Sequence, residues 1–195
     1  MSGDVSTLQR LTVFTGAAPG LDPRYVAVAA ELGGWLAESG IELVYGGGTV
    51  GMMGALADAV LAGGGRVTGV MPEALMEREL AHRGITTLEV VPDMHARKSR
   101  MAELADGFVA LPGGAGTLEE FFEVWTWQRL GFHDKPVALY DVAGFWQPLL
   151  GAVESMATAG FLSPGYQESL VVAQGPAELT SVLASWRTPA TTWRA

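Results

Sequence analysis

Residues 107–130 of this chain read GFVALPGGAGTLEEFFEVWTWQRL, and the order of signals in them indicates the class of fold. The apolar run from Gly107 to Leu111 is typical of a buried strand, and Pro112 ends it. A glycine-rich turn follows, and apolar residues at helical spacing then predict a helix over 117–130. A strand, a tight turn and a helix in this order form the unit from which parallel α/β sheets are built.

The same alternation extends along the chain in both directions. Strands are predicted at 11–15, 41–45, 66–70, 86–91, 107–111 and 136–140, and helices at 22–39, 52–61, 73–81, 95–106, 117–130, 146–159 and 176–186. This order predicts an α/β, Rossmann-like, doubly wound parallel sheet with helices on both faces. We expect a single nucleotide-binding domain over 1–195, with loose termini at about 1–10 and 188–195.

The composition excludes several classes of protein. The chain has 195 residues, the length of one domain, and its 49% hydrophobic and 17% charged residues are typical of a globular protein. A net charge of −9 argues against nonspecific binding to nucleic acid or to an anionic membrane. The chain contains no cysteine, which excludes disulfides and thiolate chemistry. We find neither a signal-peptide core nor an apolar run of membrane-spanning length, so we expect a cytoplasmic location.

Three glycine-bearing turns follow predicted strands, at 16–20, 46–51 and 112–117. In open parallel sheets the ligand binds beyond the carboxyl ends of the strands, where free backbone amides at helix starts attract anions. In the third turn, glycines let the backbone approach a phosphate closely, and no lysine follows as it would in a Walker A loop. Phosphate binding is therefore favoured over the alternative of a plain glycine-rich turn.

Two further observations concern these turns. Glu120 follows the third turn, and Thr117-x-x-Glu120 also matches a capping box, in which the glutamate only bonds the start of the helix. The second turn matches G-x-G-x-x-G, but no acidic residue ends the next strand, so NAD and FAD are disfavoured. We expect no cofactor. His95 and His133 have no partners at metal-ligand spacing, so we expect no metal.

The sequence Met94-His-Ala-Arg-Lys98 opens the helix predicted after the fourth strand. Arg97 is a candidate to bind a phosphate or a pair of hydroxyls, because its guanidinium presents a fork of donors. For Lys98 taken alone, ordinary surface charge is the favoured explanation.

Several motifs resemble one family. Pro112-Gly-Gly-Ala-Gly-Thr-Leu-Glu-Glu120 resembles the PGGxGTxxE signature of the LOG (Lonely Guy) family, the cytokinin riboside 5′-monophosphate phosphoribohydrolases, often labelled lysine decarboxylases. Val44-Tyr-Gly-Gly-Gly48, Gly51-Met-Met-Gly54 and Met94-His-Ala-Arg-Lys98 are similar to the same family, so the resemblance covers most of the chain. It implies hydrolysis of the N-glycosidic bond of adenine-type nucleoside 5′-monophosphates to free base and ribose 5-phosphate. It also implies a homodimer, with a hexamer left open.

The resemblance further implies a set of site residues. Arg97 and Glu120 match the catalytic pair of the family. Positions expected to bind substrate are Glu79, Lys98, Gly114, Ala115, Gly116, Thr117, Leu118, Glu119 and Thr126, to which the turns and the helix start add Gly16, Gly47, Gly113 and Met94. The third turn would anchor the 5′-phosphate and Glu120 would contact the ribose. Arg97 would assist the leaving base or fix the ribose and phosphate.

One departure and two alternatives accompany this interpretation. The family usually carries Gly-Ser-Ser after the first strand, where this chain has Gly16-Ala17-Ala18 and so lacks two hydroxyls. A non-catalytic nucleotide or cofactor-binding module, resembling molybdenum-cofactor carrier proteins, is the alternative function, and hydrolysis of AMP is an alternative activity. Lysine decarboxylation is rejected, because Lys98 and Lys135 are the only lysines and neither lies in a pyridoxal-binding pattern.

Overall fold

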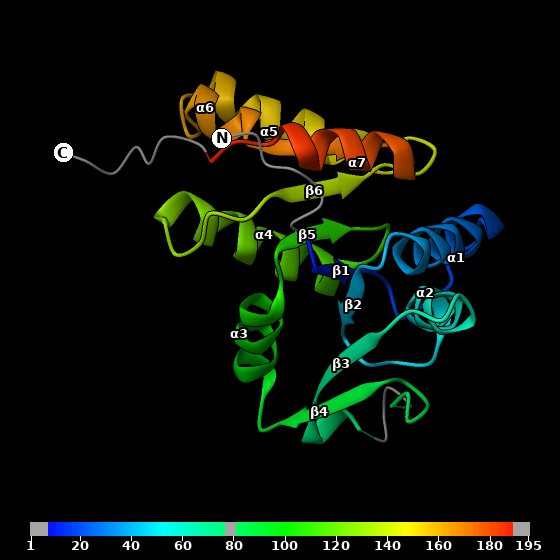
Figure 1. Cartoon of the computed structure of the whole chain (residues 1–195). Coiled ribbons are helices and arrows are strands. Elements are labelled where there is room, and N and C mark those ends of the chain that lie inside the picture. Colours follow the sequence, from blue (N-terminus) through cyan, green and yellow to red (C-terminus); the bar gives the residue numbers. More distant parts are fainter. Residues whose placement is uncertain (1–7, 77–80, 189–195) are drawn as a thin grey trace.

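The computed structural model describes residues 8–76 and 81–188. Its centre is a seven-stranded sheet in which every neighbouring pair is parallel (Figure 1). In spatial order the strands are β4 (Thr87–Val91), β3 (Val67–Pro72), β2 (Glu42–Tyr45), β1 (Arg10–Phe14), β5 (Gly107–Ala110), β6 (Val137–Tyr140) and β7 (Leu170–Ala173). The predicted doubly wound α/β fold is confirmed.

Helices cover both faces of this sheet. One face carries α1 (Pro23–Glu38), α2 (Gly51–Ala62) and α7 (Pro176–Ser185), and the other carries α3 (Met94–Leu104), α4 (Ala115–Leu130), α5 (Gln147–Thr158) and α6 (Pro164–Glu168). Figure 1 shows α1 and α2 side by side against the β1–β3 part of the sheet, with α3 on the opposite side.

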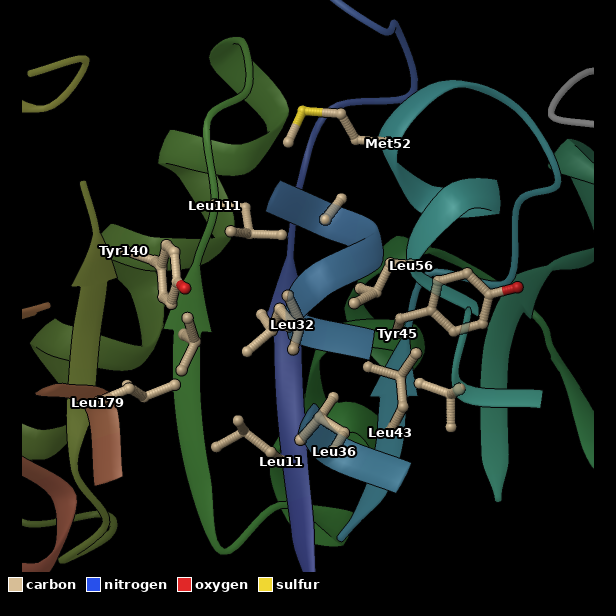
Figure 2. Close-up of a cluster of buried hydrophobic side chains, with 14 of the residues drawn as sticks. Leu11, Leu32, Leu36, Leu43, Tyr45, Met52, Leu56, Leu111, Tyr140 and Leu179 are labelled. Atoms are coloured by element: carbon tan, nitrogen blue, oxygen red, sulfur yellow. The ribbon is translucent and has the colours of Figure 1, made fainter. Parts of the chain in front are cut away.

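Side chains alternate between two buried cores along the central strands. Leu11 and Val13 of β1 face the helices α1 and α2, whereas Phe14 faces α3 and α4. Figure 2 shows the first core, where leucines of α1 meet leucines of the strands and Leu179 of α7. A sheet buried on both faces is typical of parallel α/β proteins, and it places ligands at its strand ends instead of on a face.

Local sequence signals set the ends of several helices. Asp22 caps α1 by accepting from the Arg24 backbone N–H, and Pro23 occupies the first helical position, as predicted. Asp93 caps α3 in the same way through Ala96. Gly131 ends α4 in a left-handed conformation with φ of 76°, which a glycine adopts without strain.

The order of the strands reverses between β1 and β5. From β1 the chain adds β2, β3 and β4 on one side, and then returns to add β5, β6 and β7 on the other. The helices that follow β1 and β5 therefore leave on opposite faces, which opens a crevice between the two strand ends.

Two parts of the chain differ from the sequence prediction. Helix α6 and strand β7 were not predicted, and they extend the sheet beyond the expected six strands. Of the helix predicted over 73–81, the described residues form a 3₁₀ turn at Glu73–Leu75 and a bridge between Ala81 and Gly48, and residues 77–80 lie outside the described residues. Both differences lie away from the central strands.

Candidate active site

A pocket of about 480 Å³ opens at the carboxyl ends of the central strands. The three glycine-bearing turns line it together, through Gly16 of the first turn, Gly46 of the second and Gly113, Gly114 and Gly116 of the third. This volume lies within the usual range for a small-molecule site, and its position at the reversal of strand order is the one expected for a doubly wound sheet.

Hydrogen bonds hold the first and third turns against each other. The backbone N–H of Gly16 and the hydroxyl of Thr15 both donate to the Pro112 carbonyl oxygen, each at 3.2 Å. A Cβ on Gly113 would lie 2.0 Å from the Thr117 Oγ1 atom, so this turn closes only with glycine at that position. The buried Thr117 hydroxyl therefore lies directly under the turn.

Helix α4 begins at Ala115, with the exposed Gly114 as its N-cap residue and no capping side chain. Its first backbone N–H groups lack partners within the helix, which makes the turn a suitable place for an anion. The alternative that Thr117 and Glu120 form a capping box is wrong, because the helix begins two residues before Thr117.

Arg97 and Glu120 meet at the pocket although they lie on different helices. The Nη2 atom of Arg97 is 3.9 Å from Oε1 of Glu120, and both side chains are largely buried, at 7% and 12% exposure. Arg97 Nη2 also donates to the Gly46 carbonyl oxygen at 3.4 Å, and Nη1 lies 3.6 Å from the Met94 sulfur. The Nε atom is buried without a hydrogen-bond partner among the described residues.

Lys98 has a different environment from the adjacent Arg97. Its ammonium forms ion pairs with Glu119 and with Glu123, the latter at 3.1 Å, and its side chain is 8% exposed. Burial alone would lower the pKa of Lys98, but the hydrogen bonds to the two carboxylates outweigh it and raise the pKa. Lys98 is thus neither a surface charge nor part of the pocket wall, while Glu119 lines the pocket.

The remaining predicted substrate-binding residues divide into three groups. Met94 lines the pocket and is 39% exposed. Ala115, Leu118, Thr126 and Gly47 are not in its wall: Ala115 and Thr126 are exposed on α4, and Leu118 packs against the core on that face of the sheet. Gly47 is buried, with a φ of 83° and its carbonyl bonded to the His82 N–H. Glu79 lies outside the described residues.

An apolar wall was not predicted as part of the site. It consists of Phe14, Tyr25, Met52, Met53, Met101 and Phe145, and it adjoins Ala17 and Ala18, whose place near the ligand the sequence had indicated. The pair Met52 and Met53 follows the second glycine turn directly, so its position after Gly51 was the signal available in the sequence.

Within residues 8–76 and 81–188, no group of three or more His, Asp or Glu side chains is placed to hold a metal ion. Over the same residues, no helix is both long and apolar enough to cross a membrane. His133 is tied to the fold instead, since Nε2 lies 2.8 Å from the Val124 carbonyl oxygen and Nδ1 accepts from the Lys135 N–H.

The fold and the pocket define a Rossmann-like α/β protein with a small-molecule site at the topological switch point of its sheet. A family model described as "Possible lysine decarboxylase" matches residues 53–183. The cytokinin riboside 5′-monophosphate phosphoribohydrolase of Rhodococcoides fascians is 46% identical over 94% of this chain and 91% of its own length. The enzyme of that name from Arabidopsis thaliana, LOG7, is 45% identical over 93% of this chain and 83% of its own. The chain belongs to the LOG family.

Solved structures agree on the fold. The molybdenum cofactor carrier protein of Chlamydomonas reinhardtii superposes with a TM-score of 0.66 over 90% of this chain and 95% of that one, at 20% identity. The molybdenum cofactor binding protein of Rippkaea orientalis gives 0.67 over 90% and 94%, also at 20% identity. At this identity the likeness shows the fold alone.

Neither lysine of the chain suits a decarboxylase that holds pyridoxal phosphate. The ammonium of Lys98 is taken up by two carboxylates, and that of Lys135 donates to the Ala102 carbonyl oxygen at 2.7 Å. A Schiff-base lysine needs a free amine facing a pocket. The words of the family description therefore do not fit the chemistry of this site.

Proposed function

We propose that this protein is a cytokinin riboside 5′-monophosphate phosphoribohydrolase, which hydrolyses an adenine-type nucleoside 5′-monophosphate to free base and ribose 5-phosphate. The observation that carries the proposal is the pair of Arg97 and Glu120, buried beside a glycine-rich turn at the start of a helix. A module that only binds a nucleotide would not need this carboxylate. The names of the bacterial and plant relatives support the same reaction.

The reaction breaks the C1′–N9 bond and joins water oxygen to C1′. One proton of the water stays on the new hydroxyl and the other balances the departing base. Positive charge develops on the ribose as the bond breaks, and the carboxylate of Glu120 is proposed to stabilise it. The third turn, 113–117, is proposed to hold the 5′-phosphate through backbone N–H groups.

Arg97 is proposed to act beside Glu120. Its guanidinium cannot accept a proton at neutral pH and so cannot be a general base. It acts instead as a charged hydrogen-bond donor to the ribose, the phosphate or the leaving base. Its buried Nε atom has no hydrogen-bond partner among residues 8–76 and 81–188, which supports a guanidinium whose donors are not all used in holding the fold. A nucleotide held by the neighbouring turn would supply contacts that the guanidinium of Arg97 does not make within the protein.

The apolar wall supports an adenine with an apolar substituent over AMP itself. Four methionines and three aromatic side chains line the pocket, namely Met52, Met53, Met94, Met101, Phe14, Tyr25 and Phe145. Methionine adapts its shape to an apolar group more easily than other core residues do. The ratio of base release from isopentenyladenosine monophosphate to that from AMP tests this preference.

The proposal is tested by chromatography of the base released by wild-type protein and by Glu120→Gln. This change keeps the shape of the side chain and removes its charge, so kcat is expected to fall by ~10²-fold or more while the fold is retained. Glu154→Gln, on the exposed side of α5, is the matched control and should retain full activity. Near wild-type turnover in Glu120→Gln would contradict the assignment.

We also propose a homodimer and a cytoplasmic location. Exposed apolar side chains at the end of α4 support a partner surface, with Leu130 43% and Phe132 73% exposed. The lack of cysteine suits a reducing compartment. Light scattering of the purified protein gives its mass in solution, and a monomer or a hexamer would contradict the dimer.

A further inference from the structure

Gly46 lies where β2 ends at the pocket, and its surroundings have no room for a side chain. A Cβ atom at this position would lie 2.0 Å from Nη2 and 3.2 Å from Cζ of Arg97. The next nearest atom is the sulfur of Met53, at 3.3 Å. Non-bonded carbon and nitrogen atoms do not approach to 2.0 Å, so any side chain here displaces the guanidinium.

The backbone of Gly46 does not itself require glycine. Its φ lies outside the left-handed region, in contrast to Gly47 at 83° and Gly51 at 60° in the same turn. Other residues could therefore adopt the conformation of Gly46 without strain. What excludes them is the guanidinium of Arg97.

We infer that Gly46 is a positioning residue for Arg97, an inference that rests on the proposed function. The missing side chain leaves the space that the guanidinium occupies, and the Gly46 carbonyl oxygen accepts from Nη2 at 3.4 Å. The atom that a Cβ would displace, Nη2, is the one that lies 3.9 Å from Glu120. A change at residue 46 therefore acts directly on the geometry of the proposed catalytic pair.

This inference also explains the G-x-G-x-x-G pattern of the second turn without a dinucleotide. The first glycine of the pattern gives space to Arg97. The last, Gly51, has a φ of 60°, and a Cβ on it would lie 2.1 Å from the Ala17 carbonyl oxygen of the first turn. The side chain of Arg97 thus accounts for the first glycine of the pattern, and packing against the first turn accounts for the last.

The test is a double-mutant cycle between Gly46→Ala and Arg97→Ala. Because the displaced group is the end of a flexible side chain, Gly46→Ala should fold with a Tm near that of wild type. A displacement of about 1 Å at a reacting centre costs ~10²-fold, so kcat/KM should fall by that order. In the Arg97→Ala background, Gly46→Ala should cause no further loss. Gly34→Ala is the matched control, since a Cβ there meets nothing within 4 Å.

Three outcomes would overturn the inference. Losses that multiply in the double variant would show that Gly46 acts through something other than Arg97, and full activity of Gly46→Ala would show that the methyl group is harmless. A crystal structure of Gly46→Ala reports the guanidinium independently of turnover, and finding it unmoved would also refute the inference. Failure of the proposed function is a separate result, namely that wild-type protein releases no base from either nucleotide.

Discussion

Ala17 and Ala18 form the part of the pocket wall that follows β1, and both are exposed there. Neither offers a hydrogen-bonding group beyond its backbone. At these two positions the polar groups that a ligand can meet are therefore those of the backbone alone. A single added hydroxyl would therefore change the hydrogen bonds that this wall offers to a ligand, without disturbing the core beneath it.

Ala18→Ser is expected to lower KM for the nucleotide by about 2- to 10-fold, the value of one added hydrogen bond, with kcat little changed. The hydroxyl is placed in open space, so no repacking is required. Initial-rate kinetics measure the effect, and Ala152→Ser on the exposed side of α5 is the control. An unchanged or higher KM would show that the ligand makes no contact at this position.

Helices α3 and α4 each carry one member of the proposed catalytic pair, so their relative position matters for the chemistry. Lys98 directly follows Arg97 in the chain, and Glu119 directly precedes Glu120. These two neighbours form an ion pair of their own. Glu123, one turn further along α4, adds a second carboxylate to the same ammonium. This contact joins the two helices beside Arg97 and Glu120.

Lys98→Met is expected to lower the free energy of unfolding by about 1–3 kcal/mol, because it leaves a half-buried pair of carboxylates without their cation. It should also lower kcat, since α3 and α4 lose the contact beside the pair. Denaturant unfolding and base release measure the two effects. Arg100→Met, on the more exposed side of α3, is the control and should cost at most about 1 kcal/mol. Unchanged stability in Lys98→Met would contradict the role of this contact.

The elements of the site were more predictable than the contacts between them. Glycine turns after apolar runs predicted three walls of the pocket, because local chain direction follows from local sequence. The direction of the Lys98 ammonium could not be predicted, because it depends on how α3 packs beside α4. Strand β7 was missed because its four apolar residues, Leu170–Ala173, carry no periodicity that separates a short strand from a helix segment.

At the scale of the whole molecule, stability depends on how buried groups titrate. Burial lowers the pKa of His133 from its usual value near 6.5, and both ring nitrogens bond to backbone groups in a way that suits the neutral imidazole. The unfolded chain takes up a proton on this ring at a higher pH than the folded chain does. The stability contributed by the neutral ring is thus present above about pH 6.5 and is lost as pH falls below it.

The expected result is a fall in the free energy of unfolding of wild-type protein between pH 7.5 and 5.5, which is smaller in His133→Gln. Glutamine has no group that titrates in this range. Urea unfolding at each pH measures the difference between the two proteins. His82→Gln is the control, because the His82 ring bonds to Asp58 near the surface. If the free energy of unfolding falls equally with pH in wild type and in His133→Gln, the His133 ring titrates alike in the folded and the unfolded chain, and the prediction is wrong.

The reversal of strand order between β1 and β5 has a consequence for how such a molecule can change over generations. The central strands end where the turns that form the pocket begin, and hydrogen bonds to the Pro112 carbonyl oxygen join the first turn to the third. Mutations at exposed positions of the turns can therefore change which nucleotide is preferred without disturbing the sheet. Ala17 and Ala18 are positions of this kind, so related proteins can evolve a new substrate preference through a few substitutions there.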